Sequence, residues 1–154
     1  MTYMNLETFI VEAKAHTYVG NSRKSLSYRP SSQDLQHHNG DFSYLDSCFG
    51  GRDFIGQEVV YHRKNPLWAM NYYGRIIKPD LITPAEVSTI LKVALSEQYQ
   101  EGRFLGGFKC HHLWGLYIDT NSGGHECFTG YEWIEVQGVK AYELHYHGGL
   151  IRQE

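Results

Sequence analysis

The sequence has no excess of basic residues and no long apolar run. Its 154 residues include 14 Lys and Arg against 17 Asp and Glu, for a formal net charge of -3. A protein that tracks nucleic-acid phosphates is expected to carry a basic stripe, so we expect no nucleic-acid partner. No apolar run approaches the length of a membrane span, and the N-terminal stretch Met1–Glu7 lacks the basic and apolar regions of a signal peptide. We therefore expect no membrane association.

Cysteines are few, and motifs for cofactors are lacking. Cys48, Cys110 and Cys127 are an odd number without the spacing of a disulfide framework, which is typical of reduced thiols in the cytoplasm. The sequence contains no phosphate-binding loop, dinucleotide-binding glycine pattern or esterase nucleophile motif, so no cofactor is expected. Cys110, His112, His125 and Cys127 could be combined into a zinc site, but the predicted strand pairing separates His112 from Cys127 by roughly 17 Å. We expect no metal site there.

The composition that remains is that of an ordinary globular protein, with 42% hydrophobic and 20% charged residues. The length suits one domain spanning residues 1–154. We recognise no internal repeat and no linker. The first fifteen residues predict an amphipathic helix, because apolar residues recur at helical spacing in Leu6, Phe9, Ile10 and Ala13. Residues 20–40 are polar and rich in Gly and Ser, so we expect a long loop that closes over the rest of the domain.

The remainder of the chain alternates between strand patterns and one helix. Residues 54–62 and 67–76 predict a hairpin, and Thr83, Pro84 and Glu86 form the signature of a helix start, with that helix ending near Gly102. Residues 113–120, 125–136 and 139–147 predict three more strands, the last two joined at Gln137 and Gly138. The fold class is therefore α+β, with a curved, largely antiparallel sheet of about five to six strands, an N-terminal helix and one central helix.

Strand alternation then predicts which side chains share a face. With a two-residue turn at 137–138 and an unbroken ladder, Glu132 faces Glu143, and His145 and His147 lie further along the same face. Like charges directly across a ladder are destabilising, so the two glutamates require an explanation. They share a proton as a catalytic pair, they hold a cation, or they point into water at the sheet edge.

The histidines and the first hairpin extend this hypothesis. His145 and His147 project with Glu143 and are candidates for metal binding or for proton transfer, although a strand histidine is more often structural. In the first hairpin, a turn of even length places Glu58, His62, Asn71 and Tyr73 on one polar face. That face is either a pocket wall or an ordinary solvated face.

Short segments along nearly the whole chain resemble an uncharacterised bacterial domain family that occurs alone or fused behind helix-turn-helix regulators of the Xre type. The segments are residues 15–18, 28–31, 40–41, 44–46, 50–58, 68–74, 130–132 and 146–151. The resemblance implies a set of repeated polar positions, at Tyr18, Arg29, Asp46, Glu58, Asn71, Tyr73, Glu132, Glu143 and His147. This chain departs from the family pattern at His145, where an aromatic residue is usual, which counts against a metal site formed by two histidines.

We interpret the chain as a small-molecule-binding domain for a polar or cationic ligand, with a metabolite sensor as one version of this role. The first alternative is a cofactor-free enzyme, an isomerase, lyase or hydrolase, with Glu132, Glu143, His147 and Tyr73 as catalytic residues. The expected ligand-binding residues are Glu58, Asn71, Tyr18, Arg29 and Asp46. The second alternative is an interaction module of the immunity or antitoxin kind, which requires exposed Tyr and Trp on a flat face and no enclosed pocket.

Overall fold

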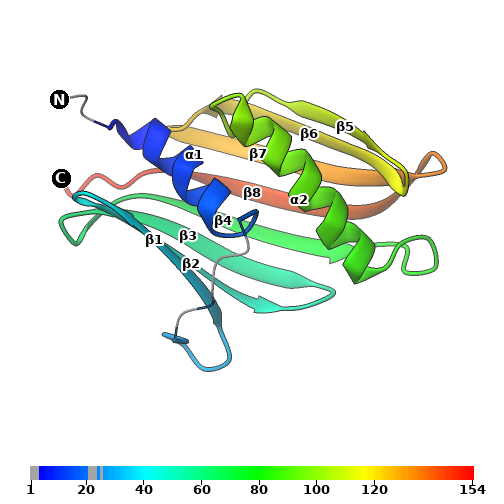
Figure 1. Ribbon diagram of the computed structural model, residues 1–154, viewed down its shortest axis with the longest axis horizontal. Helices are drawn as coiled ribbons and strands as arrows, with labels where there is room; N and C mark the ends of the chain where they lie inside the picture. Colours follow the sequence, from blue (N-terminus) through cyan, green and yellow to red (C-terminus); the bar gives the residue numbers. More distant parts are fainter. Residues whose placement is uncertain (1–3, 21–23, 25) are drawn as a thin grey trace.

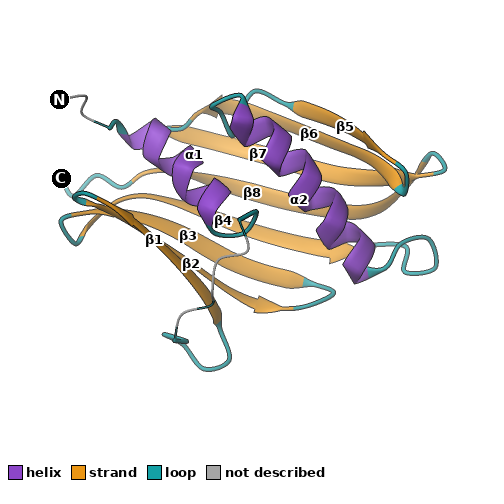
Figure 2. Cartoon of the chain, in the orientation of Figure 1, coloured by secondary structure: helices purple, strands orange, loops and turns teal. Residues whose placement is uncertain are grey.

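Residues 4–20, 24 and 26–154 are described by a computed structural model, and they form two helices and one antiparallel sheet of eight strands. Figure 1 shows both helices lying on the same face of a strongly twisted sheet, and Figure 2 separates the helix layer from the strand layer. The elements are α1 (Leu6–His16), β1 (Gln33–Asn39), β2 (Phe42–Gly50), β3 (Phe54–His62), β4 (Asn65–Ile76), α2 (Pro84–Gln100), β5 (Phe108–His112), β6 (Gly115–Gly124), β7 (Cys127–Val136) and β8 (Val139–Leu150).

The α+β class and both predicted helices are confirmed, but the sheet is larger than predicted. Helix α2 begins with the expected capping box, in which the Thr83 side chain accepts from the Glu86 backbone and the Glu86 side chain accepts from the Thr83 backbone. The predicted loop over residues 20–40 is wrong for β1, since Gln33–Asn39 pairs with β2 along its whole length. Residues 21–23 and 25 of that predicted loop lie outside the described residues. Strands β2 and β5 were also not predicted.

The strand order is β1-β2-β3-β4-β8-β7-β6-β5, so two four-stranded meanders meet at the β4–β8 pair. Each meander is preceded by a helix, and the chain is therefore two α-β-β-β-β units in succession. Helix α1 contacts β1 and β2, while α2 contacts β5 and β6. The two units are related by an approximate two-fold axis that passes through the β4–β8 pair, where Tyr72 lies directly opposite Tyr146.

Details of the backbone repeat between the two units. Each ends in a hairpin with a two-residue turn in the left-handed conformation, at Arg63-Lys64 and at Gln137-Gly138. Each hairpin then carries one extra residue, Leu67 or Ala141, that has no partner across the ladder. The two bulged residues accept equivalent hydrogen bonds at 2.7 Å, from the Ile151 backbone to Leu67 and from the Ile77 backbone to Ala141.

The sequence expectation of no internal repeat is therefore wrong. Once the strands are matched, identical residues recur at equivalent positions: Tyr44/Tyr117, Asp46/Asp119, Gly50/Gly123, Phe54/Phe128, Gly56/Gly130, Glu58/Glu132, Tyr72/Tyr146 and Gly74/Gly148. Three residues separate Gly50 from Phe54, whereas four separate the equivalent Gly123 from Phe128, and this difference breaks the spacing of the repeat in the sequence.

The two bulges also overturn the predicted faces. Val136 pairs with Val139 as expected, but the bulge shifts the register, so that Glu132 lies opposite Leu144 and Glu143 lies opposite Trp133. Because side chains alternate along a strand, Glu132 and Glu143 project from opposite faces of the sheet. The predicted pairing of these two carboxylates is wrong.

The bulge at Leu67 acts in the same way on the first hairpin. It places Glu58 opposite Met70, on the face covered by the helices, whereas Asn71 and Tyr73 lie on the other face. The predicted polar face of Glu58, His62, Asn71 and Tyr73 is therefore wrong as a set.

Candidate functional site

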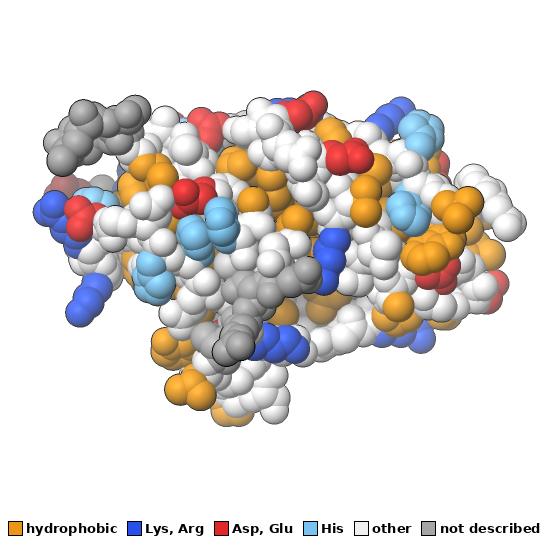
Figure 3. All heavy atoms as spheres, in the orientation of Figure 1, with side chains coloured by type: hydrophobic (Ala, Val, Ile, Leu, Met, Phe, Trp, Pro, Cys, Tyr) orange, Lys and Arg blue, Asp and Glu red, His pale blue; other side chains and the backbone are white. Residues whose placement is uncertain are grey.

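A cavity of about 630 Å³ lies between the two helices and the sheet. Its wall takes residues from α1, α2 and strands of both units. Figure 3 looks onto this face, where the surface is hollowed beside α2 and Lys and Arg side chains (blue) lie near the hollow. The volume is in the range of small-molecule sites. Most of the apolar wall comes from aliphatic and aromatic side chains: Leu35, Phe54, Met70, Ile76, Val87, Leu91, Leu95, Phe104 and Leu144.

Four buried carboxyl groups lie in this wall, namely Asp46, Glu58, Asp119 and Glu132. Each accepts a hydrogen bond from a tyrosine hydroxyl. Tyr44 donates to Glu58, Tyr72 donates to Asp46 at 2.7 Å, Tyr117 donates to Glu132 and Tyr146 donates to Asp119 at 2.7 Å. The four bonds form two equivalent pairs, one in each unit. A buried carboxyl needs such donors, because burying it without them is costly.

Two glycines make room for two of these tyrosines. A Cβ atom at Gly56 would lie 2.3 Å from the Tyr72 hydroxyl, and one at Gly130 would lie 1.8 Å from the Tyr146 ring. The rings of Tyr72 and Tyr146 therefore lie flat across the neighbouring strand, which carries each hydroxyl to its carboxyl group. The absence of a side chain at these two positions is thus part of the site.

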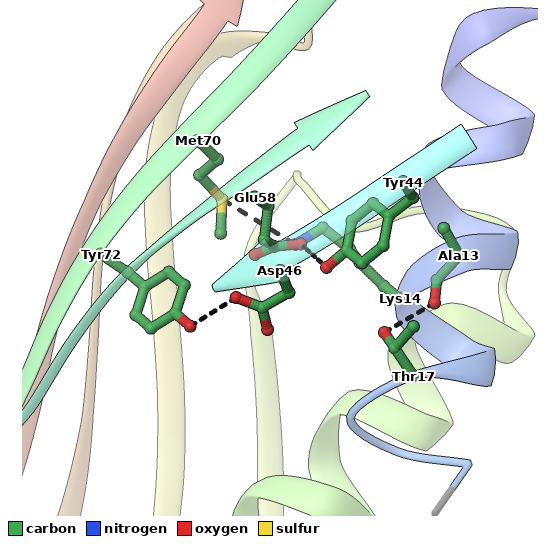
Figure 4. A network of polar contacts seen from close by, with 8 residues as sticks. All are labelled: Ala13, Lys14, Thr17, Tyr44, Asp46, Glu58, Met70 and Tyr72. Atoms are coloured by element: carbon green, nitrogen blue, oxygen red, sulfur yellow. Dashed lines mark hydrogen bonds and ion pairs between the residues drawn. The ribbon is translucent and has the colours of Figure 1, made fainter. Parts of the chain in front are cut away.

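The first unit contains an ion pair inside the cavity. Lys14 projects from α1, and its Nζ lies 2.9 Å from Oε1 and 3.0 Å from Oε2 of Glu58 (Figure 4). Both side chains are 7% exposed. Figure 4 also shows Asp46 and Tyr72 beside this pair. A buried ion pair of this kind is stable only when further hydrogen bonds complete it, and Tyr44 supplies one of them.

Burial leaves two of the carboxyl groups partly protonated near neutral pH. Removal from water raises the pKa of Glu132 to about 7, against the opposing hydrogen bonds from Tyr117 and Tyr142. Burial, together with the nearby charge of Glu58, raises the pKa of Asp46 to about 7. Burial likewise raises the pKa of Asp119. Groups with such values either exchange protons at physiological pH or become charged when a cation arrives.

The predicted site residues divide between the cavity and the rest of the surface. Glu132, Glu58, Asp46 and Tyr18 line the cavity. Glu143, His147, Tyr73 and Asn71 lie on the opposite face of the sheet, where Tyr73, His147 and Asn71 are exposed. Arg29 lies outside the cavity as well, with its guanidinium 3.2 Å from the Ser47 hydroxyl and stacked on the ring of Phe49.

Glu143 has partners of its own on the outer face. Its carboxylate accepts from the Tyr131 hydroxyl and from Arg75 Nε, both at 2.7 Å. These two contacts lower the pKa of Glu143. Glu143 is therefore a charged surface group in an ion pair, and it does not share a pocket with Glu132.

The cavity wall also contains residues that were not predicted as site residues from the sequence, among them Lys14, Tyr44, Tyr72, Gln98, Tyr117, Asp119 and Tyr146. The signal that identifies most of them is the repeat. The pattern Tyr-x-Asp, two glycines, then Phe-x-Gly-x-Glu, occurs at residues 44–58 and again at 117–132. Nothing in the local sequence marks Lys14 or Gln98, because their role depends on the packing of two helices over the sheet.

A family model described as a domain of unknown function, DUF5680, matches residues 46–151. The match covers more than half of the chain and includes Asp46, Glu58, Asp119 and Glu132. The chain belongs to this family. Searches of curated proteins and of solved structures gave no match. Within the described residues, neither helix is long and apolar enough to cross a membrane, and no cluster of three or more His, Cys, Asp or Glu residues is arranged to hold a metal ion.

Proposed function

We propose that this chain binds a small organic cation in the cavity between the helices and the sheet. The observation that carries the proposal is the lining of the cavity, where four buried carboxyl groups face one buried lysine. The tyrosine hydroxyls supply polar contacts for orientation, and the aliphatic wall suits the carbon skeleton of a ligand.

Charge in the cavity favours a cation over an anion. If all four carboxyl groups are ionised, Lys14 neutralises only one of them, and a ligand carboxylate would meet the others at low dielectric. Lys24, Arg52 and Lys92 also reach the cavity, but Lys24 and Arg52 are exposed and Lys92 is half-buried, so solvent screens them more than the inner groups. The four buried carboxyl groups therefore make the cavity favour a cationic ligand over an anionic one.

Matched pairs of probes test this function. Glucosamine and glucose have nearly the same shape but differ by an amino group, as do 1,4-diaminobutane and 1,4-butanediol. We expect the amines to raise the thermal unfolding temperature, with a stabilisation of about 2.7 kcal/mol when the ligand is at a hundred times its Kd. The neutral partners should have no such effect. Equal responses to amines and alcohols, or no response to any probe, would contradict a cation site.

Two variants connect the response to the cavity. Asp46→Asn and Glu132→Gln each remove one inner charge with little change in shape, and both should weaken amine binding. Glu143→Gln is the matched control, because it removes a charge of the same kind from the outer face. If the amine binds in the cavity, Glu143→Gln should bind it with the same affinity as the wild type.

A second candidate is a cofactor-free acid–base enzyme, because the pKa values of Asp46 and Glu132 lie near 7. The groups would be Glu132 and Asp46 in place of the expected combination of Glu132 with Glu143 and His147. In this version Glu132→Gln retains substrate affinity but abolishes turnover. Parallel loss of affinity without any detectable reaction favours a binding role such as a metabolite sensor. The interaction-module hypothesis required no enclosed pocket, and the cavity makes ligand binding the better supported proposal.

A further inference from the structure

The two units present equivalent carboxyl sites to the same cavity. Glu58 and Tyr44 in the first unit correspond to Glu132 and Tyr117 in the second, and both pairs are hydrogen-bonded in the same way. The two-fold axis runs between Tyr72 and Tyr146, so one site lies on each side of it. What occupies the first site therefore indicates what the second site is shaped to hold.

The first site already contains an ammonium group. Lys14 Nζ lies within 3.0 Å of both oxygens of Glu58, and Tyr44 donates to the same carboxylate (Figure 4). The arrangement consists of a primary ammonium, a carboxylate and a phenol, and the ammonium also lies 3.9 Å from Met70 Sδ and 5.3 Å from the centre of the Phe104 ring. The contact between Lys14 and Glu58 therefore shows how such a carboxyl site binds a primary ammonium group.

The second site lacks the corresponding lysine. The apolar stripe of α1, formed by Leu6, Phe9, Ile10 and Ala13, matches that of α2, formed by Val87, Ile90, Leu91 and Ala94. Lys14 directly follows the first stripe, and Leu95 directly follows the second. Both side chains line the cavity. Over the residues that the structure describes, Glu132 has no ion-pair partner, and its hydrogen bonds come from the neutral hydroxyls of Tyr117 and Tyr142.

An independent observation also points to a ligand. Gln98, on α2, is 1% exposed and lines the same cavity. Among the described residues, its Nε2 has no hydrogen-bond partner. A buried amide without a hydrogen-bond partner is destabilising, so such a group is expected to meet an acceptor. The four carboxyl groups of the cavity disfavour an anionic acceptor, which leaves a hydroxyl or carbonyl oxygen.

We propose that the Glu132 site binds the primary ammonium group of a hydroxylated aliphatic amine, in the position against Glu132 that Lys14 takes against Glu58. A hydroxyl of the same ligand accepts from Gln98 Nε2. The ligand class is therefore the amino alcohols and amino sugars. This inference rests on the proposed binding function and assigns the ligand to one of the two sites.

The substitution Leu95→Lys tests the assignment, because it supplies the second unit with the lysine that the first unit already has. The new ammonium should occupy the Glu132 site and reduce glucosamine affinity on the order of tenfold to a hundredfold, the value of one charge-assisted hydrogen bond. Val93→Lys is the matched control. It adds the same charge to the same helix at a position that is 38% exposed, and it should leave the affinity unchanged.

Isothermal titration calorimetry with glucosamine, glucose and 1,4-diaminobutane separates the outcomes. The proteins compared are the wild type, Leu95→Lys, Val93→Lys, Glu132→Gln, Asp46→Asn and Gln98→Leu. Loss of glucosamine binding in Leu95→Lys and Glu132→Gln, with full binding in Val93→Lys, supports the inference. Full binding in Glu132→Gln together with loss in Asp46→Asn overturns the assignment but leaves the cation site in place. Equal binding of glucosamine and glucose by the wild type overturns both. Glu132→Gln is nearly isosteric, so it gives an answer even if Leu95→Lys does not fold.

Gln98→Leu tests the second contact by itself. It should weaken glucosamine more than 1,4-diaminobutane, because only the sugar carries a hydroxyl acceptor. An equal effect on the two amines would contradict the role of Gln98 and leave a plain diamine as the better ligand class.

Discussion

Replacing Glu132 with Gln should stabilise this protein at alkaline pH, contrary to the usual effect of substituting a buried, hydrogen-bonded residue. Glu132 is 6% exposed and forms no ion pair within the described part of the chain. Its charged form is therefore costly in the folded protein, and burial raises its pKa from 4.5 to about 7. Gln has nearly the same shape and carries no charge at any pH.

The magnitude follows from the two pKa values. The folded protein holds this proton more tightly than the unfolded chain, so stability decreases as the pH rises from about 4.5 to about 7 and stays low above that range. The full cost of ionising the buried group is about 3 kcal/mol, at about 1.4 kcal/mol per pH unit. Most of this cost, about 2–3 kcal/mol, develops between pH 5 and pH 8. Gln has one acceptor oxygen where Glu has two, so the variant loses the hydrogen bond donated by Tyr117 or by Tyr142. This loss lowers the stability of the variant by about 1 kcal/mol at every pH.

Urea unfolding of the wild type and Glu132→Gln at pH 5, 6, 7 and 8 measures the difference. The variant should be equal or slightly less stable at pH 5 and more stable by about 2 kcal/mol at pH 8. Asp46 also titrates in this window, but it does so in both proteins and largely cancels in the difference. Glu143→Gln is a control of opposite sign. Contacts with Tyr131 and Arg75 lower the pKa of Glu143, so its removal should destabilise the protein at neutral pH, with a smaller effect in acid.

A stability difference for Glu132→Gln that stays constant from pH 5 to pH 8 would refute this reasoning. It would mean that Glu132 is solvated in the folded protein or paired with a cation. The same measurements at high salt check the point, since a buried group responds weakly to screening.

Three further predictions concern the structure around the site. Lys14→Met leaves Glu58 buried without its cation and should cost about 3–5 kcal/mol in urea unfolding, with most of the loss recovered when Glu58→Gln is added. Gly130→Ala forces the ring of Tyr146 away from the strand and should cost about 1–3 kcal/mol, seen as a lower urea midpoint and a change in near-ultraviolet circular dichroism. Thr83→Ala removes the capping box of α2 and should lower the stability by about 1 kcal/mol in thermal unfolding. Its amine affinity should be unchanged, because the substitution affects only the start of the helix.

Local sequence features were sufficient to predict the two helices and several strands. The stripe of Phe9 and Ile10 gives α1, and the Thr83 to Glu86 capping box gives the start of α2. These features act within one or two turns of helix, so no tertiary information is needed. Strand β1 was missed because Gln33–Asn39 is polar, and it is ordered by pairing with β2 instead of by its own propensity.

The site was predicted only in part, because the two bulges are a property of how the strands pair and have no signature in the sequence of one strand. A single unpaired residue, Leu67 or Ala141, reverses which side chains share a face beyond it. Alternation in the sequence does not reveal such a residue, so Glu132 was wrongly grouped with Glu143. The repeat was visible in principle, as Tyr-x-Asp and Phe-x-Gly-x-Glu occur twice, but one extra residue between Gly123 and Phe128 broke its spacing.

The sequence by itself determined the helices, the hairpin turns and the identity of the carboxyl and tyrosine groups. Only the tertiary structure decided that Asp46, Glu58, Asp119 and Glu132 are enclosed together, because that requires two units to join at β4 and β8 and two helices to cover the same face. Burial follows from that assembly, and the raised pKa values of Asp46 and Glu132 follow from burial. The chemistry of the cavity is thus a property of the paired units, which neither unit carries alone.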